Sequence, residues 1–271
     1  MADQPINMAQ YAPRHSDALC GREFLLEMDD GYRRSLRFHA PGMLQWAKGE
    51  ENAKEAACVC LDAGDGVWFI SFDLCPQPRE NLTLVLDLRE GLVTLVRALQ
   101  GCNPKRPTAI ELQVLPGAVE LPGQVLNTKR HGYSADLVGK AIRWQYSEDF
   151  AIVHIYPSER YYRIKLLQKL GDPDSPYEVA MRNYVDRTEP AIYVRIREGL
   201  ILFGFVEDNM DKVTGPEISC ASRLQLINTK TMTTLGRGFA APGTPLDLYG
   251  AVGSFEELPA EDFDPASVYT V

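Results

Sequence analysis

The sequence of 271 residues lacks a long apolar run, a basic excess and a signal-peptide pattern. No apolar stretch reaches the roughly 18 residues that a membrane-spanning helix needs, and residues 1–5 have neither a basic start nor an apolar core. We therefore expect a cytoplasmic protein without a membrane partner. Asp and Glu outnumber Lys and Arg by 37 to 28, and the formal net charge of −9 has the wrong sign for binding phosphate backbones. Nucleic acid is accordingly not an expected partner.

Metal-binding and nucleotide-binding patterns are also missing. The six cysteines form no CxxC pair, and no histidine stands at zinc-ligand spacing. Cys58 and Cys60 fall on one face of a strand-like run, which favours a free buried pair over a metal or redox site. No Gly-rich phosphate loop or dinucleotide fingerprint is present. We therefore predict no metal and no cofactor.

Helical periodicity is almost absent, whereas short β-rich runs recur between Gly, Pro, Asn and Asp residues. This pattern predicts an all-β protein. In the first half of the chain the expected strands are residues 23–28, 34–38, 43–46, 56–61, 67–72, 82–87 and 92–97. A Pro-containing connection is expected over residues 103–129, and a second series of strands begins near Tyr133.

The two series of strands look like copies of one another. Leu19-Cys20-Gly21-Arg22 parallels Leu137-Val138-Gly139-Lys140, and the run from Asp65 to Phe72 parallels the run from Glu198 to Phe205. A duplicated barrel module is the simplest explanation. The expected organisation is an N-terminal arm over 1–18, a first module over 19–130, a second module over 131–250 and an acidic tail over 251–271.

Titratable and aromatic residues fall on the strand faces of the second half that should point inward. Successive strand residues alternate between faces, so residues two apart share a side. The shared-face groups are Ile142, Trp144 and Tyr146; Ile152, His154 and Tyr156; Ala180, Arg182 and Tyr184; and Ile201, Phe203, Phe205 and Glu207. Polar groups buried without partners cost several kcal/mol each, so these groups either satisfy one another or await a ligand.

The order of several short motifs resembles the MoaF family of two-module, lipocalin-like proteins, named after molybdenum-cofactor biosynthesis. The resemblance covers about residues 19 to 240, and its strongest part is the order of the motifs. In the first half the motifs are Leu19-Cys20-Gly21-Arg22, Asp30-Gly31, Leu36-Arg37-Phe38, Leu44-Gln45-Trp46, Asp65-Gly66-Val67-Trp68-Phe69 and Leu84-Val85-Leu86-Asp87. In the second half they are Asp136-Leu137-Val138-Gly139, Tyr146-Ser147, His154-Ile155-Tyr156 and Phe205-Val206-Glu207. The resemblance implies two lipocalin-like or calycin-like antiparallel β-barrels.

The second half is also similar to phenolic acid decarboxylases, which have a cofactor-free calycin-type barrel. That resemblance places Tyr146 on the second residue of a tyrosine pair, with Trp144 in place of the first. It also places Arg182 and Glu207 on the arginine and glutamate that surround the substrate in that family.

The predicted function is a cofactor-independent enzyme of small-molecule biosynthesis, with isomerase, cyclase or lyase chemistry on a hydrophobic, conjugated substrate. Glu207 and His154 would exchange the proton, and Arg182 would hold an oxyanion or carboxylate. The substrate-binding wall would comprise Trp144, Tyr146, Tyr156, Tyr162, Tyr184, Phe203 and Phe205.

Three alternatives stay open at this point. His154 could be hydrogen-bonded to a tyrosine for structural reasons, Glu207 could be only the ion-pair partner of Arg182, and the aromatic residues could be core. The chain would then be a non-catalytic, lipocalin-like binding protein with a link to molybdenum-cofactor metabolism, or an interaction scaffold. Assembly into a homo-oligomer is left open.

Overall fold

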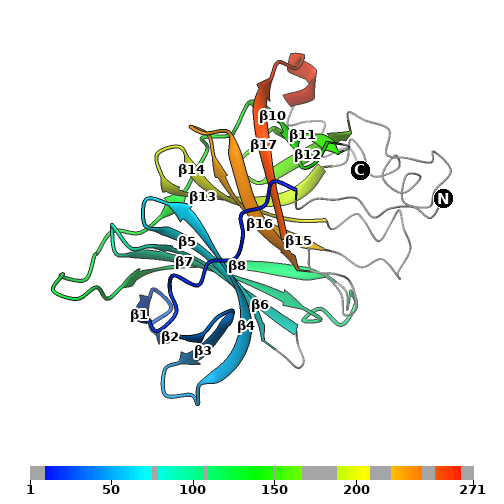
Figure 1. Ribbon diagram of the computed structural model, residues 1–271. Coiled ribbons are helices and arrows are strands. Elements are labelled where there is room, and N and C mark those ends of the chain that lie inside the picture. The colour runs from blue at the N-terminus through cyan, green and yellow to red at the C-terminus, as the bar shows by residue number, and fades with distance from the viewer. Residues whose placement is uncertain are drawn as a thin grey trace, which may run out of the picture. The chain divides into compact units, whose positions relative to one another are not determined.

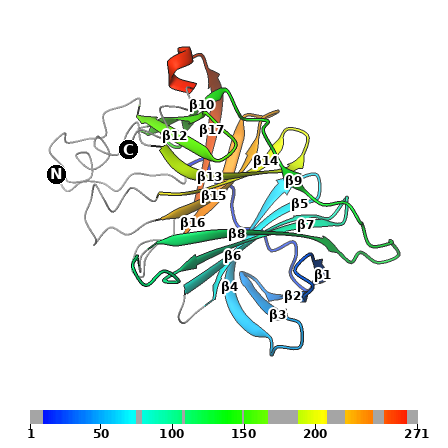
Figure 2. The same ribbon diagram turned by 180° about the vertical axis from the view of Figure 1, so that it is seen from behind.

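The computed structural model describes residues 10–74, 79–106, 109–148, 150–166, 188–207, 221–239 and 248–263. The chain divides into two compact units, one formed by residues 13–132 and one by residues 133–271 together with residues 1–12. Each unit is built around an antiparallel β-barrel (Figures 1 and 2). Within the described ranges, helix is confined to the 3-10 helix η1, Ala260–Phe263. The predicted all-β fold with two barrel modules is confirmed.

The first barrel is a closed ring of eight consecutive strands in which β1 pairs with both β2 and β8. Every strand runs antiparallel to its neighbours, and alternate side chains fill the interior, as the period of two requires. The strands are β1 (Glu23–Met28), β2 (Arg33–Ala40), β3 (Met43–Lys48), β4 (Lys54–Gly64), β5 (Val67–Leu74), β6 (Arg79–Asp87), β7 (Leu92–Gln100) and β8 (Ile110–Val119).

Strand β8 lies inside the segment that was expected to be a connection, and this expectation was wrong. Pro116 disfavours a strand in the sequence because proline has no backbone N–H to donate to a ladder. In the structure Pro116 is paired with Thr94 of β7, whereas pairing with β1 begins only at Gly117. Proline is tolerated there because it lies beside the part of β8 that has a single partner strand.

The second barrel contains eight strands that close by pairing β12 with β13, and the short strand β9 (Gly132–Tyr133) adds to β13. The order around the ring follows the chain, with β17 returning to pair with β10. The strands are β10 (Lys140–Gln145), β11 (Ala151–Tyr156), β12 (Tyr161–Leu166), β13 (Thr188–Arg197), β14 (Leu200–Val206), β15 (Ser222–Asn228), β16 (Thr233–Phe239) and β17 (Leu248–Glu256).

The two barrels enter their first strand through the same turn, which supports the repeat seen in the sequence. In the first barrel Arg22 N donates to Leu19 O, and in the second Lys140 N donates to Leu137 O. The glycine inside each turn has a positive φ, 81° at Gly21 and 75° at Gly139, which a residue with a Cβ adopts only at a cost. Leu19 and Leu137 are each buried in the core of their own barrel.

The C-terminal boundary of the second module lies further along the chain than expected. Residues 251–256 continue β17, and Ala251 belongs to the barrel core. After β17, Leu258 and Phe263 pack against Ala141, Val153 and Ile155 on the outer face of β10 and β11. The alternation of β17 is obscured by its glycines, which is why the sequence pattern predicts too short a strand. The tail from residue 264 lies outside the described residues.

The connections at the two ends of the second barrel differ in length. At one end the chain turns between β13 and β14 and between β15 and β16 within a few residues, and the buried Leu137 contributes to the core. At the opposite end, the segments 167–187, 207–221 and 240–247 join successive strands. Tyr146, Glu207, Arg223 and Tyr249 stand at or next to the strand termini of this second end.

Candidate functional site

The matching registers of the two barrels allow their interiors to be compared position by position. Phe24 of β1 is paired with Leu36 of β2, and the equivalent pair in the second barrel is Ile142 with His154. Leu36 is therefore the counterpart of His154. Differences at matched positions show where the interiors of the two barrels diverge.

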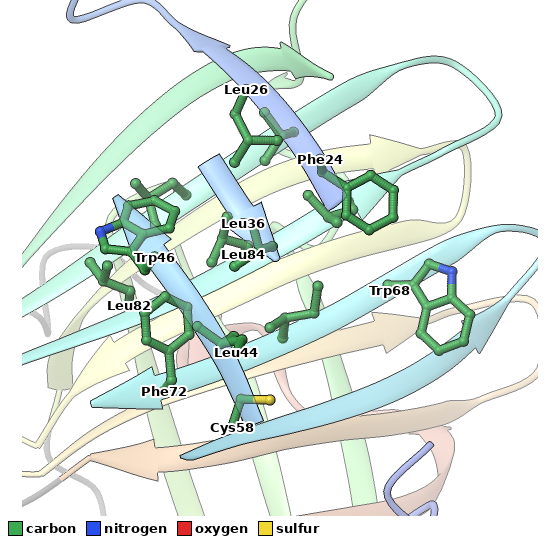
Figure 3. Packing of buried hydrophobic residues seen from close by; sticks show 14 of the residues in the cluster. Phe24, Leu26, Leu36, Leu44, Trp46, Cys58, Trp68, Phe72, Leu82 and Leu84 are labelled. Atoms are coloured by element: carbon green, nitrogen blue, oxygen red, sulfur yellow. The ribbon is translucent and has the colours of Figure 1, made fainter. Parts of the chain in front are cut away.

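The interior of the first barrel is apolar apart from Arg34, which is 3% exposed and paired with Asp30. Its core cluster consists of buried Leu, Phe, Trp, Val, Ile, Met, Ala and Cys side chains, several of which Figure 3 shows packed together from different strands. Trp46 and Phe72 meet edge-on, with ring centroids 5.6 Å apart. Burial raises the pKa of the Cys60 thiol to about 12, so this cysteine is protonated and unreactive at neutral pH. The predicted structural role of the Cys58 and Cys60 pair fits this geometry.

The interior of the second barrel carries polar groups at the same positions. In the first barrel Ile70 is paired with Leu84, and Phe72 is paired with Leu82. The matching pairs in the second barrel are Phe203 with Gln225 and Phe205 with Arg223. The full set of replacements is Met28 by Tyr146, Leu36 by His154, Phe38 by Tyr156, Leu44 by Tyr162, Ala56 by Glu189, Cys60 by Tyr193, Leu74 by Glu207, Leu82 by Arg223, Leu84 by Gln225 and Leu115 by Tyr249.

His154 lies in the centre of an aromatic cage. Its side chain is fully buried, and its ring meets those of Tyr162, Phe203 and Phe205 edge-on at centroid distances of 5.4, 5.7 and 6.0 Å. The hydroxyl of Tyr156 lies 3.5 Å from His154 Nδ1, and the indole Nε1 of Trp144 donates to the same hydroxyl at 3.4 Å. Trp144, Tyr156 and His154 therefore form a buried chain of hydrogen bonds.

Burial lowers the pKa of His154 to about 3, with a smaller contribution in the same direction from the positive charge of Arg223. The imidazole is therefore neutral at physiological pH. The predicted proton exchange would need the imidazole to take up a proton, which burial opposes because the surrounding aromatic rings remove the water that would stabilise the imidazolium. In its neutral state His154 acts through hydrogen bonds, with one ring nitrogen as donor and the other as acceptor.

Gln225 and Tyr249 add further hydrogen-bonding groups to the interior. Gln225 Nε2 donates to the hydroxyl of Tyr146 at 3.2 Å. The hydroxyl of Tyr249 donates to the backbone oxygens of Arg237 at 3.2 Å and Leu224 at 3.4 Å. Burial raises the pKa of Tyr146 to about 12 and the pKa of Tyr249 well above its ordinary value, so both phenols are neutral.

Glu207 and Arg223 form an ion pair at the end of the barrel where β14 ends and β15 begins. Arg223 Nε donates to Glu207 Oε1 at 3.1 Å, and the exposed fractions of the arginine and glutamate side chains are 20% and 8%. The guanidinium also lies 5.8 Å from the centroid of the Tyr249 ring. The pair therefore stands between the buried aromatic interior and the strand termini, where both charges keep part of their hydration.

The structure brings most of the predicted site residues together. Glu207 and His154 reach the same interior, as do the predicted wall residues Trp144, Tyr146, Tyr156, Tyr162, Phe203 and Phe205. Arg182 and Tyr184 lie outside the described residues. One of the open alternatives paired Glu207 with Arg182, and the partner that the structure describes is Arg223.

Several interior residues are missed by the sequence interpretation. Arg223, Gln225, Glu189 and Tyr249 share the inward face, and Glu189 and Gln225 are each 1% exposed. A usable signal is present, because Gln225-Leu226-Ile227-Asn228 parallels Leu84-Val85-Leu86-Asp87 once Asn228 is matched to Asp87. Extending that parallel by parity, with the register of the first barrel, places Gln225 and Arg223 on the inward face.

A shallow groove of about 490 Å³ lies outside this interior, beside the start of β10 and the end of β17. It is lined by Lys140, Ala141, Phe255, Glu256, Leu258 and Phe263, among others. The predicted site residues do not contribute to it. Among the described residues, no three His, Cys, Asp or Glu side chains gather as a set of metal ligands, and no helix is long and apolar enough to cross a membrane.

Comparison with known proteins identifies a family for the first part of the chain. No curated protein matches the sequence. A solved structure titled "Crystal Structure of a putative beta-lactamase from Burkholderia vietnamiensis" aligns with 15% identity and a TM-score of 0.30, over 40% of this chain and 97% of that one. The similarity of the second barrel to phenolic acid decarboxylases stays a prediction. Residues 8–99 match the family described as "MoaF N-terminal domain", which confirms the predicted resemblance to the MoaF family for this part of the chain.

Proposed function

We propose that the second barrel is the active site of a cofactor-independent enzyme that transfers a proton within a hydrophobic, conjugated small molecule. The reaction would be of the isomerase, cyclase or lyase type. The observation that carries the proposal is the replacement of Leu36, Leu74, Leu82 and Leu84 by His154, Glu207, Arg223 and Gln225 at matched interior positions. Polar and charged groups are costly to bury, and the first barrel has leucine at each of these four positions.

The charged pair and the aromatic interior would have different roles. Glu207 follows the last residue of β14 and is paired with Arg223, and it would exchange the proton with the substrate. Arg223, which donates a hydrogen bond to Glu207, would stabilise negative charge that develops on a substrate oxygen. Phe203, Phe205 and Tyr162 would orient the conjugated part of the substrate by stacking. We keep the proposed role of Arg182 as an anion-binding residue. Because Arg182 lies outside the described residues, this role is tested by mutation.

The test is deuterium exchange at carbon. The purified full chain is incubated in D₂O with a small-molecule extract of the producing cells, and the extract is then examined by mass spectrometry for new carbon-bound deuterium. We expect one or more conjugated metabolites to gain deuterium, and Glu207→Gln to lower the rate by about 10²–10³. Asp136→Asn is the matched control, because Asp136 is paired with Arg195 away from the interior. Equal labelling with wild type, Glu207→Gln and no protein would overturn the proposal.

A lipocalin-like binding protein without catalysis is the second candidate, and one observation favours it. His154 is neutral because of its burial, and a neutral, hydrogen-bonded imidazole suits recognition better than proton transfer. The two candidates separate in one experiment. Native mass spectrometry that shows a retained small molecule, combined with no deuterium transfer to that molecule, would favour binding over catalysis.

A further inference from the structure

Two buried polar atoms on side chains beside Phe203, inside the second barrel, have no hydrogen-bond partner among the described residues. They are Nε2 of His154 and Oε1 of Gln225. The side chains are 0% and 1% exposed, so water at the surface does not satisfy them. An unpaired buried donor or acceptor costs about 1–3 kcal/mol, and two such atoms in one small interior suggest that a bound molecule completes them.

The hydrogen bonds already present make one of these atoms a donor and the other an acceptor. The Tyr156 oxygen accepts the Trp144 N–H, so its own hydrogen is available for His154 Nδ1. With Nδ1 as acceptor, the neutral imidazole carries its hydrogen on Nε2. Gln225 Nε2 donates to Tyr146, which leaves the amide oxygen Oε1 as an acceptor. The two side chains thus offer one free donor and one free acceptor.

Both atoms belong to side chains that flank Phe203. Gln225 is the cross-strand partner of Phe203, and the His154 ring lies 5.7 Å from the Phe203 ring. The rings of Tyr162 and Phe205 lie 5.2 and 5.1 Å from that of Phe203, measured between centroids. A group that meets both polar atoms would therefore have aromatic side chains as its neighbours.

We propose that this pair binds a hydroxyl group on an aromatic or conjugated ring of the ligand. The hydroxyl oxygen accepts from His154 Nε2–H, and its hydrogen is donated to Gln225 Oε1. A carboxylate, a carbonyl and a methyl ether all lack the hydrogen that Gln225 needs, and an aromatic amine is a poor acceptor for His154. The inference rests on the proposed function, because it names the substrate class of the same barrel. Trp144 and Tyr156 are positioning residues that set the tautomer of His154.

The tautomer is measured first, in the full chain without ligand. Side-chain ¹⁵N NMR of His154 should show hydrogen on Nε2 and none on Nδ1 at pH 7. Tyr156→Phe, which introduces the residue that the first barrel has at Phe38, should shift the population toward the other tautomer. Hydrogen on Nδ1 in the wild type would overturn the inference and leave the proposed function standing.

Ligand preference is measured next, by calorimetry with 4-vinylphenol, 4-methoxystyrene and styrene. These probes share a conjugated ring, and 4-vinylphenol alone has a hydroxyl hydrogen. We expect 4-vinylphenol to bind about tenfold more tightly than the other two, the equivalent of one hydrogen bond. Gln225→Leu and His154→Leu, which introduce the leucines that the first barrel has at positions 84 and 36, should each abolish this preference while styrene still binds. Gln45→Leu, in the first barrel, is the matched control and should change nothing.

The outcomes separate the two proposals. Equal affinity for all three probes would overturn the hydroxyl assignment and leave a hydrophobic binding barrel. A preference that persists in both leucine variants would place the hydroxyl elsewhere and would also overturn the assignment. Failure of every probe to bind would count against the barrel as a site for conjugated rings and would overturn both proposals. Circular dichroism of each variant establishes that it is folded.

Discussion

Leu36 and His154 occupy matched positions in the two barrels, and only one of them responds to pH. His154 is neutral in the folded chain because burial lowers its pKa from 6.5 to about 3. In the unfolded chain it regains its ordinary pKa and binds a proton below about pH 6.5. The stability that depends on the neutral imidazole is therefore fully present above that pH, and it is lost as the pH falls toward 3.

The first prediction follows from this linkage. Between pH 6 and pH 4.5 the free energy of unfolding of the wild type should fall by as much as about 1.4 kcal/mol per pH unit more than that of His154→Leu. Urea unfolding at several pH values measures the difference. Asp30 does not interfere, because its pKa is lowered to about 2 by the hydrogen bond from Arg34, and its contribution is lost only below about pH 4. Parallel pH profiles for the two proteins would contradict the assigned burial.

A second prediction concerns Glu207 and Arg223. If the pair serves catalysis, Glu207→Gln should lower turnover by about 10²–10³ with little loss of stability, because both side chains keep some exposure. If the pair is only structural, the stranded Arg223 charge should cost up to about 3–5 kcal/mol. Thermal melts and turnover are measured on the same preparations, with Asp136→Asn as control. Strong destabilisation with normal activity per folded molecule would refute a catalytic role.

The same experiment extends to Arg182. By resemblance to the cofactor-free decarboxylases, Arg182→Met should also abolish turnover and leave the fold intact. Binding of an uncharged conjugated probe such as styrene provides the control, since a residue that holds an oxyanion should not affect it. Normal turnover in Arg182→Met would contradict a role for Arg182 in catalysis.

At the scale of secondary structure, the sizes of paired side chains on neighbouring strands are complementary. Leu26 of β1 is paired with Val119 of β8, and the matching pair is Trp144 of β10 with Gly253 of β17. A Cβ added at Gly253 would lie 2.5 Å from the Trp144 ring, so the glycine makes room for the indole. The larger side chain on one strand therefore depends on the smaller one on its neighbour.

A third prediction tests this dependence with a double-mutant cycle. Gly253→Val alone should overpack the interior and destabilise the chain by at least about 1–3 kcal/mol. Trp144→Leu alone should also destabilise it, because it leaves a cavity and removes the bond to Tyr156. The combination, which reproduces Leu26 and Val119, should cost less than the sum of the two. Urea unfolding of all four proteins measures the coupling, and strictly additive costs would contradict the pairing.

Considered as a whole molecule, the chain contains two similar barrels, one with a mostly apolar interior and one with a more polar interior. Both copies bring their last strand back to pair with their first. The two interiors can diverge because each barrel buries its own core cluster.

The fourth prediction is the secondary-structure content of the intact protein. Since η1 is the single helical element in the described ranges, far-ultraviolet circular dichroism should show a β-dominated spectrum with less than about 10% helix. A helix content near the roughly 30% of an average globular protein would contradict the two-barrel fold.

The amino-acid sequence by itself determined the fold class and the shared faces. The period of two, with Gly and Asp at the turns, identified strands, and the repeated entry turn at Leu19 and Leu137 identified the duplication. The alternation of side chains along each strand placed Trp144, Tyr146, His154, Phe203 and Glu207 on inward faces, because every second residue of a strand points to the same side.

Tertiary structure decided which strands meet and how the site is charged. The sequence of a strand does not state its partner, so neither the closure by β8 at Pro116 nor the pairing of Phe205 with Arg223 could be predicted from local pattern. The ion pair of Glu207 with Arg223 depends on that register. The neutral state of His154 likewise depends on aromatic rings from neighbouring strands, because desolvation is a property of the assembled interior and not of any one segment.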